Sequence, residues 1–416
     1  MKSTKRLIFL VLPWVYFFTA CEDSDLGNER TFIKFFGGSF NQKAYSFREA
    51  SDGSIFIVGS SSSFGEPILI PRVFVIKTDA NGNRITQKFF GNGLDVQEGK
   101  DLTILDNGEI LVLAYGLSPS RFYLLRLNAE LDTIMTKSYG VYVNPDEKLY
   151  LRSAADGGFI LLGTSPEPQN SDKKDMILLK VDANLDSVYT RRYGLFDKDD
   201  IAGSLVIEDE NIIWCGTSNR QVDDSDMRVL QADSSGELSW SFDFEEASDT
   251  KESGLDIQKV AQEKYIVVGS KSSSDNEEDI YVVEMEVNAQ GYLKSTPRTQ
   301  LLDIGDGKAV GRSIFPTDDG GYVISGSFVQ GGNPSSFLLK INADLTKDTS
   351  WPVNPRFFGA ESDQENGDET SLCEKDQGEI VRQLSSDGGY LILNTICFQS
   401  NSVIALIKTD RLGKVF

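Results

Sequence analysis

The chain repeats one short pattern of residues seven times, and this repetition restricts the fold more than any other feature. Each unit contains a run of β-branched and aromatic residues that follows a turn, usually Gly-rich. A second run follows it, as in Val73–Asp79, and a third closes most units, as in Ile85–Gly91. The first runs are Ser54–Gly59, Glu109–Ala114, Gly158–Gly163, Asn211–Gly216, Lys264–Gly269, Gly321–Gly326 and Gly389–Asn394.

Short runs of this composition, separated by turn residues, are typical of β-strands. The first two runs of each unit are almost continuously apolar, which indicates strands buried on both faces. A weaker fourth strand precedes each turn, as in Ala44–Ala50 and Gly311–Pro316. We therefore predict four antiparallel strands per unit, with Ser239–Phe244 as the closing strand of the fifth unit.

Seven units of roughly 55 residues with four strands each predict an all-β fold, a seven-bladed β-propeller. A two-sheet sandwich needs no such self-similarity, and an open solenoid uses shorter repeats. Thr31–Gly37 is a closing strand without a preceding unit, and the last unit, ending at Leu412–Phe416, lacks its closing strand. The N-terminal strand is therefore expected to complete the last blade and close the ring, which removes exposed strand edges.

Residues 31–416 resemble the propeller repeats of secreted lipoproteins from Bacteroidetes. The resemblance lies in the Gly-Gly-Tyr phrases at 320–322 and 388–390 and the Lys-Thr-Asp phrases at 77–79 and 408–410. It implies a β-propeller at the cell envelope and says almost nothing about activity.

The N-terminus reads as a lipoprotein signal over residues 1–20. Lys2, Lys5 and Arg6 precede a run of twelve apolar residues, Leu7–Phe18, which is too short to span a bilayer and suits a secretory signal. The residues before Cys21 resemble a lipobox, which implies that Cys21 is acylated. The alternative is an ordinary signal peptide in which Cys21 occurs by chance.

Residues 21–30 form an acidic tether between the lipid and the propeller. Glu22–Asp25 resembles the tract that directs Bacteroidetes lipoproteins to the cell surface, although a merely solvated linker explains it equally well. We expect an outer-membrane lipoprotein, exposed at the surface or facing the periplasm. We expect the protein to be attached to the membrane through its N-terminal lipid.

Composition excludes several classes of function. The chain has no His, so relays of the Ser-His-Asp type and His-ligated metals are excluded. Its formal net charge is −22, which argues against nucleic acid as a partner because phosphate binding needs a cationic surface.

The connections between predicted strands divide into two faces. Short turns such as Asp52–Gly53 and Asp79–Asn83 join the first strand to the second and the third to the fourth, and they define the short-turn face. The opposite, long-loop face carries the longer connections, such as Ser60–Arg72 and Ala360–Gln377. Binding residues concentrate in such loops, so we expect a ligand site there or in the central funnel.

Four arginines fall in or near the innermost strands and are possible channel-lining residues: Arg48, Arg152, Arg312 and Arg382. They would form a cationic spot suited to a carboxylate or sulfate. Pairing with neighbouring acids is the simpler expectation. Aromatic residues beside the long loops are possible contacts for a sugar or a protein, or pack beneath those loops: Phe40, Phe64, Tyr142 and Phe196.

Cysteines and acidic loops offer further candidates. Cys373 and Cys397 belong to the last unit, and a disulfide between them is possible in an oxidising compartment. Cys215 stands at a position that apolar residues occupy in other units, so it is expected to be buried. No cofactor is expected, although the acidic loops Asp275–Asp279 and Glu361–Glu369 could hold calcium if they are not simply solvated.

No enzyme signature stands out, so catalytic residues are not assigned. We expect a non-catalytic binding or scaffold propeller for a protein or glycan partner. The alternative is a carbohydrate-active hydrolase or lyase that uses a pair of carboxylates in the funnel.

Overall fold

The computed structural model describes residues 31–38, 41–62, 70–91, 97–116, 120–166, 173–195, 198–221, 224–244, 250–274, 277–359, 377–398 and 401–415. These ranges contain 28 strands and no helix. Within them, therefore, no apolar helix of membrane-spanning length occurs. The protein is an all-β propeller built from four-stranded antiparallel meanders.

The first three meanders are separate sheets in which consecutive strands pair. Their strands are β2 (Gln42–Glu49), β3 (Ile55–Ser61), β4 (Arg72–Thr78), β5 (Arg84–Phe90), β6 (Glu98–Ile104), β7 (Ile110–Gly116), β8 (Arg121–Leu127), β9 (Thr133–Tyr142), β10 (Tyr150–Ser153), β11 (Phe159–Pro166), β12 (Lys174–Val181) and β13 (Ser187–Tyr193).

A 12-stranded sheet follows, and it consists of three more meanders. Single parallel bridges, Ser225–Lys251 and Glu278–Lys308, join one meander to the next. The strands are β14 (Asp199–Glu208), β15 (Asn211–Gln221), β16 (Asp224–Ala232), β17 (Leu238–Phe244), β18 (Lys251–Ala261), β19 (Lys264–Ser274), β20 (Glu277–Glu286), β21 (Arg298–Leu302), β22 (Lys308–Pro316), β23 (Tyr322–Gln330), β24 (Asn333–Ile341) and β25 (Arg356–Phe358).

The assignment of Ser239–Phe244 to the fifth unit is wrong. These residues lie in β17, which pairs with β16 and so closes the fourth unit. The fifth unit is closed by β21, which pairs with β20. Polar residues alternate with the aromatic residues of β17, and β21 contains no aromatic residue, so the repeated pattern did not mark this boundary in the sequence.

The last sheet brings the two ends of the described chain together. It contains β26 (Gln377–Gln383), β27 (Tyr390–Phe398), β28 (Asn401–Lys408) and the N-terminal strand β1 (Phe32–Phe36). β1 runs antiparallel to β28, with Phe32 opposite Lys408 and Phe36 opposite Ile404.

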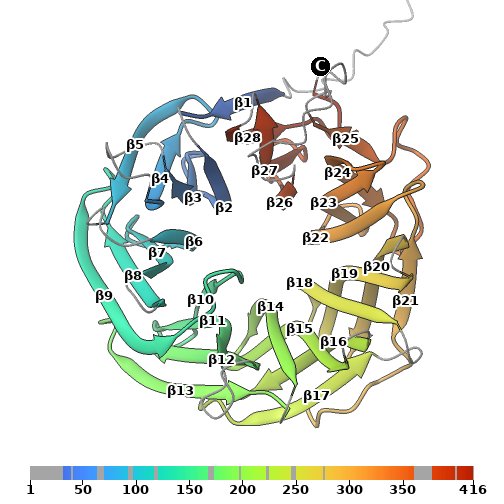
Figure 1. Ribbon diagram of the computed structural model, residues 1–416, viewed down its shortest axis with the longest axis horizontal. Helices are drawn as coiled ribbons and strands as arrows, with labels where there is room; N and C mark the ends of the chain where they lie inside the picture. The colour runs from blue at the N-terminus through green and yellow to red at the C-terminus, as the bar shows by residue number, and fades with distance from the viewer. Residues whose placement is uncertain are drawn as a thin grey trace, which may run out of the picture.

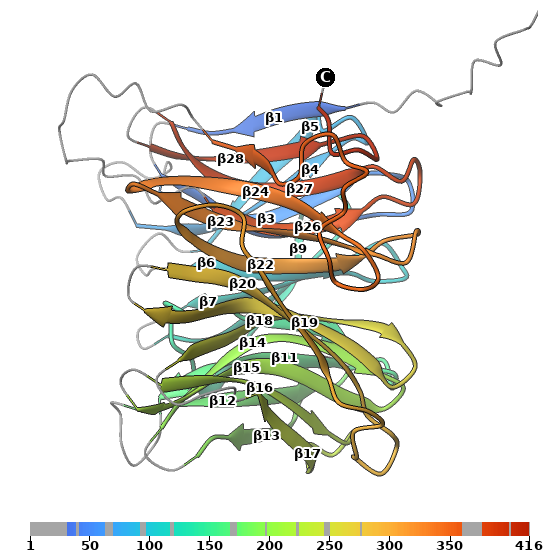
Figure 2. The same cartoon turned by 90° about the vertical axis from the view of Figure 1, so that its right-hand side faces the viewer.

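The meanders surround a common centre, and the first strand of each lies nearest to it (Figure 1). These inner strands are β2, β6, β10, β14, β18, β22 and β26. Each contacts the inner strand of the next meander, and β26 also contacts β2. Figure 2 shows the strands running between the short-turn face and the long-loop face.

Apolar clusters lie between neighbouring meanders and explain the buried runs of the sequence. Every residue of β3 and of β7 is buried. One cluster joins the last meander to the first, where Phe32 and Phe36 pack with Phe47, Phe74 and Leu406. Burial of each such side chain contributes roughly 1.5–3 kcal/mol, so packing between meanders is a main source of stability.

The short-turn face is built from a repeated Asp or Asn turn. The Asp79 carboxylate accepts hydrogen bonds from the backbone N–H groups of Asn81 and Asn83 at 2.9 and 2.8 Å. This pattern recurs at Asn128, Asp182, Asp233, Asn288 and Asp410. Asp79–Asn83 is therefore a turn whose carboxylate is occupied by backbone donors.

The described chain begins on the short-turn face. Phe32 lies opposite Lys408, just before the turn that starts at Asp410. The Thr31 hydroxyl donates to the carbonyl oxygen of Val415, beyond the same turn. Thr31 therefore lies on the face opposite the long-loop face.

Candidate functional site

The inner strands direct a ring of side chains toward the centre because most of them contain a β-bulge at the same place. The register shifts between Ala44 and Ser46 in β2, and at corresponding points in β6, β14, β18, β22 and β26. A bulge re-aims the extra residue. In five strands that residue lines the central cavity: Tyr45, Lys100, Leu255, Arg312 and Glu379.

A glycine precedes the bulged residue in four of these strands, because neighbouring sheets approach most closely there. A Cβ on Gly378 would lie 2.8 Å from the carbonyl oxygen of Gly326, and one on Gly311 would lie 2.5 Å from a methyl carbon of Val268. Close packing around the centre therefore requires glycine, and the following side chain is left to face the cavity.

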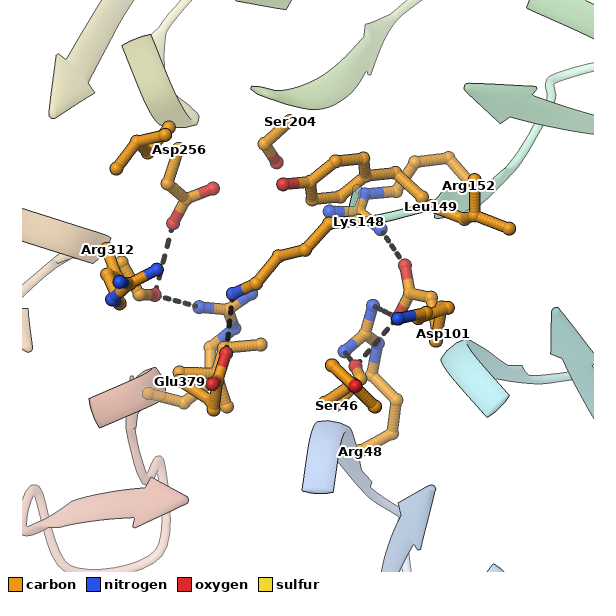
Figure 3. Close-up of a pocket in the computed structure, with 17 residues that line it drawn as sticks. Ser46, Arg48, Asp101, Lys148, Leu149, Arg152, Ser204, Asp256, Arg312 and Glu379 are labelled. Atoms are coloured by element: carbon orange, nitrogen blue, oxygen red, sulfur yellow. Dashed lines mark hydrogen bonds and ion pairs between the residues drawn. The ribbon is translucent and has the colours of Figure 1, made fainter. Parts of the chain in front are cut away.

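The inner cavity has a volume of about 40 Å³ and is lined mostly by residues with polar or charged side chains (Figure 3). Seventeen residues line it: Tyr45, Ser46, Arg48, Lys100, Asp101, Lys148, Leu149, Tyr150, Arg152, Ser204, Leu255, Asp256, Arg312, Ser313, Glu379, Ile380 and Arg382. Six of them are cationic and three are carboxylates, a formal charge of +3. The whole chain carries −22, so this is a cationic spot in an acidic protein.

Asp101 is the hub of one side of the cavity. Its Oδ1 lies 3.1 Å from Arg48 Nη2, and its Oδ2 lies 2.9 Å from Arg152 Nη1. It also accepts hydrogen bonds from the Ser46 hydroxyl and the Leu151 backbone N–H. Burial opposes ionisation of this carboxyl, but Arg48 and Arg152 outweigh it and hold its pKa below the usual range.

Arg382 comes from β26, the inner strand beside β2, and forms no ion pair with any described residue. Its Nη1 donates to the Val381 carbonyl oxygen at 2.7 Å, and its guanidinium carbon lies 5.1 Å from the centre of the Phe315 ring. Burial lowers the pKa of Arg382 to about 10. The positive charges of Arg48 and Arg152 act in the same direction, while Asp256 opposes them.

Asp256 faces the cavity but is already occupied. Its Oδ2 accepts hydrogen bonds from the Ser313 hydroxyl at 3.1 Å and the Ile314 backbone N–H at 3.0 Å. These bonds join β18 to β22 in the way that Asp101 joins β6 to β10. Both aspartates therefore hold adjacent meanders together around the centre.

Two lysines enter from the long-loop side. Lys148 Nζ lies 2.6 Å from Glu379 Oε2, in an ion pair that reaches from the segment before β10 to β26 (Figure 3). Burial opposes ionisation of Glu379, but Lys148 and Arg312 hold its pKa below the usual range. Arg312 itself makes no ion pair within the described ranges and donates weakly to the Ser327 hydroxyl at 3.4 Å.

Lys100 stands between two tyrosines. Its Nζ lies 4.0 Å from the centre of the Tyr45 ring, 5.2 Å from that of Tyr115, and 3.0 Å from Glu98 Oε2. Burial lowers the pKa of Lys100, although Glu98 opposes the shift. The ring faces and the carboxylate fix the ammonium group in place.

An outer chamber of about 510 Å³ lies above the inner cavity, toward the long-loop face. The two spaces share seven lining residues, Tyr45 and Lys148 among them, and together we call them the central funnel. The chamber is lined by Lys43, Tyr45, Glu98, Lys100, Tyr115, Pro145, Asp146, Glu147, Lys148, Tyr150, Ile201, Ala202, Leu255, Arg312 and Glu379.

The structure brings the four candidate arginines together around the inner cavity. Two of them, Arg48 and Arg152, pair with an acid, whereas Arg312 and Arg382 do not pair with any described acid. Tyr142 is 45% exposed at the end of β9, where Arg121 lies over its ring. It is separate from the funnel lining.

Several candidates lie outside the described residues. They are Cys21, Phe40, Phe64, Phe196, Cys373, the side chain of Cys397 and the acidic loop 361–369. In the described part of the chain, no group of three or more acidic or Cys residues is arranged to hold a metal ion. Cys215 is buried, and burial raises the pKa of its thiol.

Sequence reasoning missed the funnel residues Lys100, Asp101, Lys148, Asp256 and Glu379. The available signal was a Gly followed by one variable residue, a polar residue and a buried apolar one, which occurs in three units, as in Gly99–Leu102 and Gly254–Ile257. The residue after this glycine is the one that the bulge turns toward the centre.

Comparison with known proteins supports a propeller family. Residues 317–350 match the model described as "Domain of unknown function (DUF5122) beta-propeller". No curated protein is significantly similar to the chain in sequence.

Two similar solved structures are Drosophila Semaphorin 1b, extracellular domains 1–2, and Penicillium chrysogenum alpha-L-arabinanase complexed with arabinobiose. The first has 7% identity and a TM-score of 0.49 and covers 91% of this chain and 87% of its own. The second has 13% identity and a TM-score of 0.47, with coverage of 76% and 93%.

A third similar structure is a protein of unknown function from Bacteroides caccae. It has 12% identity, a TM-score of 0.37 and coverage of 79% and 94%. The similar structures include hydrolases and non-enzymes, and they do not distinguish catalysis from binding.

Proposed function

We propose that the protein is a membrane-anchored lipoprotein of the Bacteroidetes type whose propeller binds a protein or glycan partner at the cell envelope without catalysis. The observation that carries this proposal is the outer chamber of about 510 Å³ on the long-loop face. A preformed chamber of this size, lined from several rigid strands, is typical of a ligand site.

The first described residues and the chamber lie on opposite faces, which suits this role. The described chain begins on the short-turn face, beside Lys408 and Val415. A lipid on Cys21 would be joined to that face through about ten residues, which reach at most ~35 Å. The chamber would then face away from the membrane, toward partners in the surrounding space.

A closed ring of seven blades gives the chamber its rigidity in this proposal. Three observations support closure: the pairing of β1 with β28, the contact between β26 and β2, and the apolar cluster that joins the last meander to the first. Three meanders of the 12-stranded sheet and four separate sheets supply the seven blades.

Binding is favoured over the alternative of a hydrolase that uses a carboxylate pair. General acid catalysis needs a carboxyl whose pKa is raised toward neutrality. The pKa values of Asp101 and Glu379 are instead held low, and both carboxylates are engaged in ion pairs.

A glycan array and a pull-down with residues 22–416 test the proposed function, using Leu255→Trp to fill the chamber and Leu301→Trp as a control on an outer strand. We expect one class of ligand to be retained by the parent chain and the control but lost with Leu255→Trp. Equal retention by both variants would contradict a site in the funnel.

Incorporation of labelled palmitate tests the anchor separately. We expect label in the full chain and none in Cys21→Ser. Label that persists in Cys21→Ser, or its absence from the parent chain, would contradict acylation at Cys21.

A further inference from the structure

The charges of the inner cavity are unbalanced, because six cationic residues and three carboxylates line it and one of those carboxylates, Asp256, acts on Arg382 only from a distance. Asp101 forms ion pairs with Arg48 and Arg152, and Glu379 forms an ion pair with Lys148. Arg312 and Arg382 have no such partner among the described residues, although both face the same space. Like charges held together in a partly buried site repel one another, so an anion placed between them would be bound favourably.

The position of Arg382 leaves it ready to bind a ligand. Its backbone contact uses Nη1, and its flat face lies over Phe315. This anchoring fixes the guanidinium and leaves donors for a second acceptor, since the group carries five N–H donors. Arg48 and Arg152 are fixed by Asp101, so all three guanidinium groups are held before a ligand arrives.

The two spaces of the funnel differ in size, so they would hold different parts of a ligand. A volume of about 40 Å³ admits a small group, because one water needs about 10–15 Å³ on the same scale. A carboxylate or a sulfate fits such a space, and a sugar ring does not. The outer chamber of about 510 Å³ has room for one or a few rings.

The lining of the outer chamber suits a ligand rich in hydroxyl groups. Eight of its fifteen residues are charged and three are tyrosines, Tyr45, Tyr115 and Tyr150. A hydroxyl both donates and accepts hydrogen bonds, so it matches ammonium and carboxylate groups alike. An apolar peptide side chain would instead need a predominantly apolar pocket.

We propose that the funnel binds a saccharide that carries a carboxylate or sulfate group, with the anionic group in the inner cavity at Arg382 and the sugar ring in the outer chamber. This inference rests on the proposed binding function and specifies its ligand class. Asp101 is a positioning residue in this arrangement, because it acts through Arg48 and Arg152.

Calorimetric titration of the full-length protein in detergent tests the inference. The probes are trisaccharides bearing a uronate, the same sugars bearing a sulfate, the neutral parents, and a peptide with a free C-terminal carboxylate. The variants are Arg382→Gln, Arg382→Lys and, as a matched control, Arg84→Gln, which removes an exposed arginine from the outer strand β5.

We expect at least one acidic saccharide to bind about tenfold or more tightly than its neutral parent. Arg382→Gln should remove that preference, Arg382→Lys should restore it in part, and Arg84→Gln should leave it unchanged. The uronate and sulfate arms identify which anion is recognised.

Three results would overturn the inference: no binding of any acidic saccharide, equal binding of acidic and neutral forms, or unchanged preference in Arg382→Gln. Tighter binding of the peptide than of every saccharide would overturn it in favour of a protein partner. If Leu255→Trp abolished binding of the neutral sugars and Arg382→Gln had no effect, the funnel would still be the binding site. In that case only the recognition of an anionic group by Arg382 would be refuted.

Discussion

Asp101 and Arg152 form an ion pair of 2.9 Å that joins the inner strands of two neighbouring meanders, β6 and β10. The Asp101 side chain is only 5% exposed, and its second oxygen lies 3.1 Å from Arg48 of β2. One carboxylate thus links three successive meanders at the centre of the propeller. It also fixes two of the arginines that face the inner cavity.

Asp101→Asn should destabilise the fold. The substitution leaves two partly buried guanidinium groups without their carboxylate, and breaking a buried pair of this kind costs about 3–5 kcal/mol. The free energy of unfolding from urea titration measures the loss. Asp132→Asn is the control, because Asp132 pairs with Lys88 on the surface with 66% of its side chain exposed. An equal effect of the two substitutions would contradict the role of Asp101 as a hub.

The contribution of Asp101 to the free energy of unfolding should depend on pH. Its pKa in the folded protein lies below the ordinary value, so the folded state favours the ionised form. This contribution is complete above the ordinary pKa of an aspartate, about 4, and is lost as the pH falls through the lower, folded value. The difference in unfolding free energy between the parent protein and Asp101→Asn should therefore shrink as the pH is lowered below about 4. A difference that stays constant to pH 2 would be inconsistent with this.

Arg382→Gln should not lower the melting temperature of the ligand-free protein. The substitution removes a cation that has no ion-pair partner among the described residues, and whose burial and repulsion from Arg48 and Arg152 together outweigh the attraction of Asp256. Differential scanning calorimetry provides the measurement. A clear decrease in melting temperature, absent from Arg84→Gln, would show that Arg382 serves the fold rather than a ligand.

Binding of an acidic saccharide should weaken at pH values above about 10, because burial lowers the pKa of Arg382 to about that value in the free protein and a bound anion raises it again. The cation is present below this value, so affinity should be retained on the acid side and lost on the alkaline side. Titrations of the parent protein and Arg382→Gln at several pH values isolate the contribution of this residue. Parallel pH profiles for both proteins would exclude Arg382 as the group responsible.

Phe36→Ala should weaken the junction between the last meander and the first. Phe36 is 6% exposed within the cluster that joins them, whereas the neighbouring Phe35 is 61% exposed. Loss of a buried phenylalanine costs about 3–5 kcal/mol, and loss of an exposed one has little effect. Chemical denaturation of Phe36→Ala and Phe35→Ala compares the two. Similar stability of the variants would argue against closure through β1.

Gly378→Ala should destabilise the centre of the propeller, because its Cβ would lie 2.8 Å from the Gly326 carbonyl oxygen. Overpacking of this kind costs about 1–3 kcal/mol. Gly140→Ala is the control, because nothing lies within 4 Å of a Cβ there. Unfolding free energies that agree between the variants would refute the close approach of the inner sheets.

The meanders could be predicted from the sequence because their middle strands are buried on both faces. The runs at Ser54–Gly59 and Val73–Asp79 correspond to β3 and β4 and belong to almost continuous apolar stretches. The pairing of β1 with β28 also follows from the sequence, since each end of the chain holds part of one meander. The boundary at β17 could not be read in the same way, because Ser239, Ser241 and Asp243 alternate with aromatic residues.

The composition of the funnel could be predicted only in part. Strict alternation along a strand would place Tyr45 and Arg48 on opposite faces, yet both line the inner cavity because β2 contains a bulge. Arg312 stands at the bulge of β22, whereas Arg382 lies three residues beyond the bulged Glu379 of β26. Sequence position alone therefore does not show that these arginines meet.

A crystal structure of the protein with a bound acidic trisaccharide tests the central claim most directly. We expect the carboxylate or sulfate in the inner cavity, about 3 Å from the guanidinium of Arg382, and the sugar ring beside Tyr45 and Tyr150 in the outer chamber. A saccharide that occupies only the outer loops or the short-turn face, with the inner cavity free of its anionic group, would contradict recognition at the centre of the propeller.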